Sequence, residues 1–159
     1  MTFGKTLLVA LAAGTLLVGC SSNDAPTTEA DSVTVREGWV KAADDGMTSA
    51  FAEIQNTGEG QVRVVSAQSP SSPLVELHEI VSSADGSMVM KPKDGGFVVA
   101  GGDTKVLQAG GDHIMLMGVS APLDPGSDTE FTLTFEDGST STFTAQVREF
   151  AGAQENYGG

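Results

Sequence analysis

Residues 130–148 read EFTLTFEDGSTSTFTAQVR and decide the fold class. Phe131, Leu133 and Phe135 alternate with threonines, so one face of this segment is apolar and the other is polar. Such alternation is typical of a β-strand with one buried face. The Asp-Gly pair at 137–138 predicts a hairpin turn in which both residues supply positive φ angles. We therefore expect two antiparallel strands joined by a tight turn.

The rest of the chain repeats this pattern on a shorter scale. Clusters of Gly, Pro, Asp, Asn and Ser recur at intervals of roughly ten residues, and β-branched or aromatic segments lie between them. No segment keeps a helical apolar period for more than two turns, which favours an all-β sandwich or barrel. The expected strands are Val33–Val40, Ser49–Gln55, Gln61–Ala67, Val75–Val81, Met88–Lys91, Gly96–Ala100, Thr104–Gln108, His113–Gly118, Glu130–Phe135 and Thr140–Arg148.

The N-terminus has the features of an export signal. Lys5 precedes an uncharged run that is long enough for a signal peptide and short for a membrane span. The run ends in Leu-Val-Gly-Cys, which resembles the bacterial lipobox, with Cys20 as the lipidated residue. We expect residues 1–19 to be a lipoprotein signal peptide and residues 20–32 to be the lipidated cysteine with a flexible tether. The domain would then span 33–150, followed by a flexible tail at 151–159.

Composition excludes several classes of function. The formal net charge of −13 opposes binding to nucleic acid, because phosphate backbones carry the same sign. The chain has one cysteine, so it can form neither an intramolecular disulfide nor a zinc site that needs two thiolates. No G-x-S-x-G elbow accompanies either histidine, and Asp112 beside His113 would face the opposite way on a strand. We therefore do not expect an enzyme.

The two histidines lie close to methionines in the sequence. His113, Met115 and Met117 would share one face of a strand, because side chains two positions apart point the same way. His78 precedes a second pair, Met88 and Met90. Each methionine by itself is more often core filler. Imidazole and thioether together, without a thiolate, are the ligands that suit Cu(I).

Three stretches resemble one family of exported copper proteins. They are VELHEI from Val75, MVMKP from Met88, and GGDHIMLMGVSAPLDPGSDTEFTLTFEDG from Gly110, and QNTG at 55–58 adds to them. They are similar to the periplasmic copper chaperones of the PCu(A)C type (the DUF461 family), over about residues 33–148. The resemblance implies a cupredoxin-like Greek-key β-sandwich that binds Cu(I) through two histidines and two methionines. It also implies delivery of copper to a partner, such as the Cu(A) site of cytochrome c oxidase or another copper chaperone.

Carried onto this chain, the family pattern assigns His78, His113 and Met115 as copper ligands. The fourth ligand is Met90, which precedes Lys91-Pro92 as in the family. Its spacing from His78 is one residue longer than the usual family spacing. Met88 is the alternative, one position short of the usual spacing. The sequence thus predicts a Cu(I) metallochaperone that is held by its lipid on the extracytoplasmic or periplasmic side of the membrane. The competing interpretation is a surface β-sandwich that binds partners without metal.

Overall fold

The computed structural model describes Met1 and residues 27–151. In this part of the chain a 3-10 turn, η1 (Ala30–Ser32), precedes ten strands. The strands are β1 (Val33–Lys41), β2 (Gly46–Asn56), β3 (Val62–Gln68), β4 (Leu74–Ser82), β5 (Met88–Pro92), β6 (Phe97–Val99), β7 (Thr104–Leu107), β8 (His113–Val119), β9 (Asp128–Phe135) and β10 (Thr140–Arg148).

All ten strands expected from the sequence are present. The largest difference in their bounds is at β2, which begins at Gly46 rather than at Ser49, because Met47 also pairs with β8. The predicted signal peptide, Cys20, most of the tether and the tail from residue 152 lie outside the described residues. The division into signal, tether, domain and tail therefore stays a prediction. No helix within residues 27–151 is long and apolar enough to cross a membrane.

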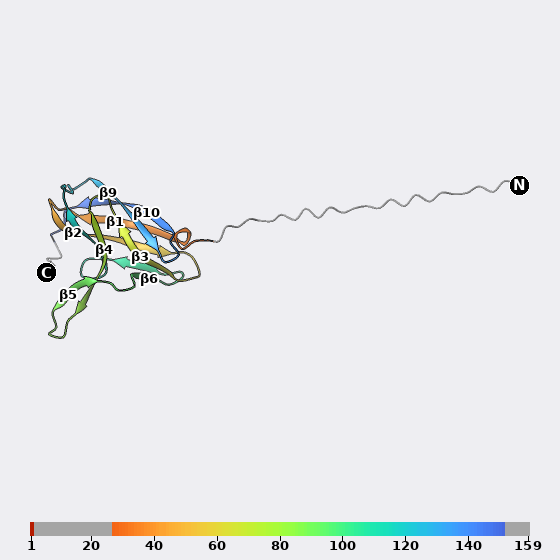
Figure 1. Ribbon diagram of the computed structural model, residues 1–159, viewed down its shortest axis with the longest axis horizontal. Coiled ribbons are helices and arrows are strands. Elements are labelled where there is room, and N and C mark those ends of the chain that lie inside the picture. The colour runs from red at the N-terminus through yellow and green to blue at the C-terminus, as the bar shows by residue number, and fades with distance from the viewer. Residues whose placement is uncertain (2–26, 152–159) are drawn as a thin grey trace.

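The strands follow one hydrogen-bonded path that folds back on itself. Its order is β5-β4-β8-β2-β1-β10-β9-β3-β6, with β7 paired to β2. β1 and β10 run parallel, while β4 is antiparallel to both β5 and β8. β3 also contacts β4 across the fold, so the two halves of the path form two layers (Figure 1). The β4–β5 hairpin extends beyond the body of this sandwich.

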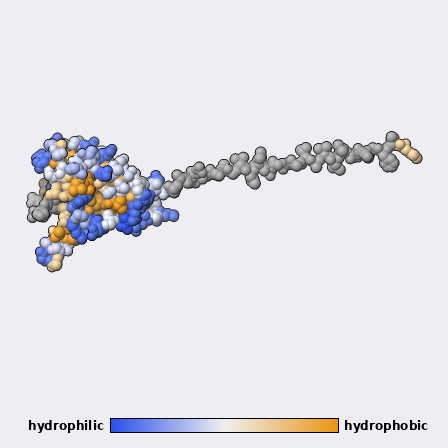
Figure 2. Space-filling model, in the orientation of Figure 1, coloured by the Kyte–Doolittle hydropathy of each residue, from blue (hydrophilic) through white to orange (hydrophobic). Residues whose placement is uncertain are grey.

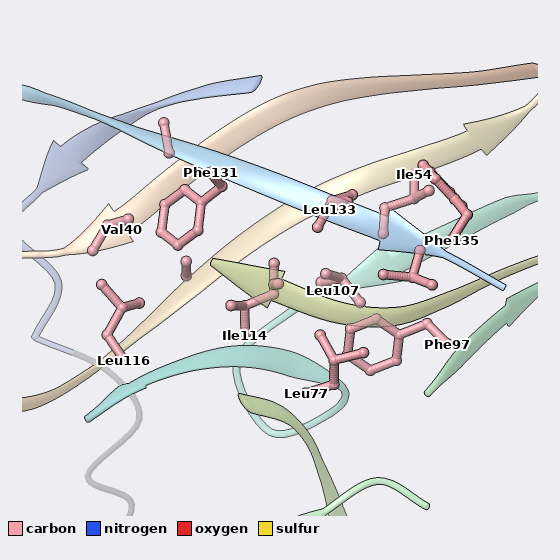
Figure 3. Packing of buried hydrophobic residues seen from close by; sticks show 14 of the residues in the cluster. Val40, Ile54, Leu77, Phe97, Leu107, Ile114, Leu116, Phe131, Leu133 and Phe135 are labelled. Atoms are coloured by element: carbon pink, nitrogen blue, oxygen red, sulfur yellow. The ribbon is translucent and has the colours of Figure 1, made fainter. Parts of the chain in front are cut away.

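The hydrophobic core lies between the two layers. Phe131, Leu133 and Phe135 of β9 are fully buried, as their alternation predicts, and Phe97 of β6 and Ile114 of β8 meet them there (Figure 3). Burial of each such side chain contributes about 1.5–3 kcal/mol relative to an exposed one. The core therefore fixes which face of each strand points inward, and it leaves the other face of β4, β8 and β2 for other contacts.

The β9–β10 turn differs in detail from the prediction. Gly138 has a positive φ of 83°, but Asp137 does not. The amide of Gly138 donates to the carbonyl of Phe135, and the amide of Phe135 donates to the carbonyl of Ser139. The expectation that Asp137 supplies a positive φ is wrong, because this loop needs the left-handed conformation at one position only, as longer hairpin loops do. The carboxylate of Asp137 instead accepts hydrogen bonds from Ser139 and from the amide of Glu29.

Candidate metal centre

The two histidines are direct cross-strand neighbours. In the antiparallel pairing of β4 with β8, His78 lies opposite His113, and their ring centroids are 5.6 Å apart at an interplanar angle of 63°. Opposed residues in such a pair point to the same side of the sheet. Ile114 and Leu116 point into the core from β8 (Figure 3), so His113 lies on the face that turns away from the core. The fold thus brings together two imidazoles that are far apart in the sequence.

Hydrogen bonds define the tautomer of each ring. Nε2 of His78 is 2.8 Å from a carboxylate oxygen of Glu76, and Nδ1 of His113 is 2.9 Å from the carbonyl oxygen of Gly111. Carboxylate and carbonyl oxygens only accept, so these two nitrogens carry the protons in neutral rings. The basic nitrogens are then Nδ1 of His78 and Nε2 of His113. A partner on the protonated nitrogen is also what orients metal-binding histidines.

The basic nitrogen of His78 is an unusual buried group. His78 is 7% exposed, and its Nδ1 makes no hydrogen bond within the described part of the chain. A buried polar atom without a partner costs about 1–3 kcal/mol. A metal ion bound at this nitrogen would remove that cost, so this atom fits a ligand role.

Met115 lies beside the histidine pair on the same face. The register places it opposite Glu76 on one side and opposite Ser49 of β2 on the other. Its side chain is 1% exposed, and its sulfur is 3.8 Å from the hydroxyl oxygen of Ser49, which donates to it. A neutral thioether therefore lies two residues along β8 from His113, on the same face as the paired imidazoles. Three of the four predicted ligands share one small area of the sheet.

The two methionines of β5 are placed at different distances along the strand from His78. Met90 is half-buried and lies opposite Ile80, two positions from His78 on the same face. Met88 lies opposite Ser82, four positions from His78. It is 62% exposed, and its sulfur accepts a hydrogen bond from the Ser82 hydroxyl at 3.3 Å. Figure 2 shows apolar surface where the β4–β5 hairpin leaves the body of the sandwich. The register favours Met90 over Met88, and the ligand assignment itself stays a prediction.

Aromatic side chains support the histidine pair from β2 and β1. The ring of Phe51 lies 6.3 Å from that of His113, and Trp39 lies 4.5 Å from Phe51. Trp39 directly follows an irregularity in β1, between Arg36 and Trp39, where Glu37 has a positive φ of 52°. Bulges of this kind redirect side chains next to functional sites. The one local signal for it is Gly38, because an isolated glycine inside a strand often marks a bulge.

A cluster of lysines flanks the site, and sequence reasoning missed it. Lys93 donates a hydrogen bond to the Glu79 carboxylate at 2.7 Å, and Lys91 lies 3.4 Å from the same carboxylate. The Asp112 carboxylate pairs with Lys105 and lies 3.4 Å from Lys93. The hydrogen bond from Lys93 lowers the pKa of Glu79, and the same bond raises the pKa of Lys93. These ion pairs connect β4, the loop after β5, β7 and the turn before β8. Asp112 is thus paired with lysines and is not part of a triad.

The described residues contain no group of three or more His, Cys, Asp and Glu side chains that could hold a metal ion. That absence covers imidazole, thiolate and carboxylate ligands in residues 27–151. It does not concern a site in which thioethers supply part of the donor set, as the arrangement of His78, His113 and Met115 would. His78, His113 and Met115 would together supply a mixed set of imidazole and thioether donors.

Known proteins match this chain in sequence and in fold. The family model described as "LpqE-like: Putative lipoprotein LpqE-like" matches residues 33–147. "Putative lipoprotein Lxx21020" of Leifsonia xyli subsp. xyli is 43% identical over 148 residues, which cover 90% of this chain and 89% of that protein.

Several solved structures resemble the chain, PCuAC domains among them. The copper-bound PCuAC domain from PmoF2 has a TM-score of 0.61 at 18% identity and covers 74% of this chain and 93% of its own. The solution structure of CuI-DR1885 from Deinococcus radiodurans has a TM-score of 0.54 at 26% identity, with 79% and 85% covered. The predicted all-β, cupredoxin-like fold and the resemblance to PCuAC proteins are confirmed. By its sequence, the chain belongs to the LpqE-like lipoprotein family.

Proposed function

We propose that this protein is a Cu(I) metallochaperone that binds its cargo through His78, His113, Met115 and Met90. The observation that carries the proposal is the cross-strand histidine pair, with ring centroids 5.6 Å apart, beside a buried methionine on the same face. Two imidazoles and a thioether on one face of neighbouring strands are the donor types that a Cu(I) site needs.

The chemistry of these donors selects the ion. Both ligand types, imidazole and thioether, are neutral, and the soft thioether sulfurs favour Cu(I) over Zn²⁺, Ca²⁺ and Mg²⁺. Four such ligands would complete the coordination of a d¹⁰ ion and leave no open position for a substrate, so the site suits transport rather than catalysis. The Glu76 carboxylate would orient His78, and the Gly111 carbonyl would orient His113.

Copper-bound relatives support the proposal, and the wider role extends it. The copper-bound PCuAC domain from PmoF2 and CuI-DR1885 share the fold of this chain. We infer delivery to a copper-accepting protein, such as the Cu(A) subunit of cytochrome c oxidase or another copper chaperone. Membership of a lipoprotein family supports an anchor at Cys20 on the extracytoplasmic or periplasmic side of the membrane. Two acyl chains would hold the protein there stably.

An anaerobic competition titration tests the metal site. Full-length protein in detergent is titrated with Cu(I) against a colorimetric Cu(I) chelator, beside the double variant His78→Asn/His113→Asn. We expect one tightly bound Cu(I) in the wild type and none in the double variant. The matched control is Glu79→Gln, which changes the adjacent residue on the opposite face and should leave binding unchanged. A wild type that takes no Cu(I) from the chelator would favour the surface module that binds partners without metal.

A fractionation experiment tests the anchor separately. In Cys20→Ser the lipidated atom is lost while the copper ligands remain. We expect this variant to leave the membrane fraction and to keep its Cu(I) affinity. Retention of Cys20→Ser in the membrane fraction would contradict the lipid anchor without affecting the metal site.

A further inference from the structure

A second pair of methionines lies on the same face as the candidate metal centre. Met47 of β2 is directly opposite Met117 of β8, and Met117 is two positions from Met115 on one side of the strand. Directly opposed residues in an antiparallel pair have Cβ atoms about 4.5–5.5 Å apart. Methionine side chains are long and flexible enough for both sulfurs to reach one ion from that separation. The fold thus forms a thioether pair next to the proposed ligand Met115.

Solvent access increases along this row of methionines. Met115 is 1% exposed, Met117 is half-buried and Met47 is 38% exposed. The sulfur of Met115 is therefore much less open than those of Met47 and Met117 to an ion that arrives from solvent or from a partner. Such an ion can reach Met47 and Met117, which form the neighbouring cross-strand pair on the same face as Met115.

We propose that Met47 and Met117 form a second, weaker Cu(I) site through which copper enters and leaves the buried site at Met115. This inference rests on the proposed function, because copper can pass from the second site to Met115 only if Met115 is itself a copper ligand. Two thioethers give a site with fewer donors than the four-ligand centre, so it holds the ion less tightly and exchanges it faster. Each step replaces one neutral ligand by another, and no redox change or proton transfer is needed.

Neighbouring positions allow a gain-of-function variant. Leu74 of β4 lies opposite Met117 on its other side and is 48% exposed, so Leu74→Met would add a third thioether to the same row. Val65 of β3 is similarly exposed, at 44%, and belongs to the other layer of the sandwich. Val65→Met therefore adds a surface thioether without extending the pair. The two variants separate a local effect from a general gain of methionine.

Methionine methyl NMR tests the pair directly. Full-length protein in detergent, with ¹³C in the methionine methyl groups, is titrated anaerobically with Cu(I), and signals are assigned from single Met→Leu variants. We expect the Met115 methyl to shift with the first equivalent and the Met47 and Met117 methyls to shift together with the second. Shifts at Met115 alone would overturn the second site and leave the chaperone intact. Shifts at Met47 and Met117 without Met115 would keep the pair as a copper site and refute the buried one.

Transfer kinetics test the path. In Met47→Leu/Met117→Leu the apolar surface is retained and only the sulfurs are lost. We expect the rate of Cu(I) transfer to an external chelator to fall about tenfold while the affinity for the first equivalent changes by less than about twofold. Leu74→Met, which adds a third thioether, should tighten binding of the second equivalent of Cu(I), and Val65→Met should not. An unchanged rate in the double variant would mean that the row is an apolar surface with no part in copper movement.

Discussion

Replacement of Met115 by leucine separates the chemistry of this side chain from its packing. Met115 is 1% exposed, and leucine keeps nearly the same volume and apolarity. Such exchanges in a well-packed interior cost less than about 1.5 kcal/mol. The variant also loses one weak O–H to sulfur contact from Ser49, at 3.8 Å. We therefore expect a fold like that of the wild type, with a melting temperature lower by only a few degrees.

The effect on copper should be much larger. The variant leaves the ion with the imidazoles of His78 and His113 and the thioether of Met90. We expect the affinity for Cu(I) to fall by about a hundredfold or more, which corresponds to about 2.7 kcal/mol. Because a soft ligand is lost while the nitrogens remain, discrimination against Zn²⁺ should decrease as well.

Competition with a colorimetric Cu(I) chelator, together with a thermal melt of the metal-free protein, measures both quantities. The matched control is Leu116→Met, which makes the reverse exchange at the next residue, where the side chain is fully buried in the core. It should have a similar cost in stability and leave the Cu(I) affinity unchanged. Equal Cu(I) affinity in wild type and Met115→Leu would refute the reasoning and identify Met115 as core filler.

Three further predictions concern the ligand assignment, pH and support of the site. Met90→Leu should weaken Cu(I) binding in the same competition assay, whereas Met88→Leu should not, and the reverse result would assign Met88 as the ligand. Hydrogen bonds from the Ser139 hydroxyl and from backbone amides lower the pKa of Asp137 below its ordinary value of 3.8. The stabilisation from the charged carboxylate is therefore present above pH 3.8 and is lost as the pH falls through the lowered pKa. Chemical unfolding at a series of pH values should show a shallower acid dependence for Asp137→Asn, and an unchanged dependence would contradict this. Phe51→Ala should lower the free energy of unfolding by about 3–5 kcal/mol in denaturant titrations, because Phe51 is only 2% exposed. A loss below about 1 kcal/mol would show that Phe51 is not well packed between Trp39 and His113.

The strands could be predicted because their signals are local. Alternation in EFTLTF and in HIMLM determines which side chains share a face, and the turn residues mark where each strand ends. All ten strands followed from these two features. The irregularity at Glu37 and the conformation of Asp137 did not, because they depend on how the flanking strands pair. Strand existence is thus a property of short segments, whereas bulges and turn types depend on the partner strand as well.

The candidate site divides in the same way. The sequence alone determined which donor types are available, and one cysteine, two histidines and clustered methionines are a set that suits Cu(I). It also determined that His113 and Met115 point the same way. Only the tertiary structure decided that His78 lies opposite His113 and that Met47, remote in sequence from the other methionines, lies opposite Met117. The physical reason is register, which is set by burial of the core face of β4, β8 and β2, because a shift of one residue would expose that face to water.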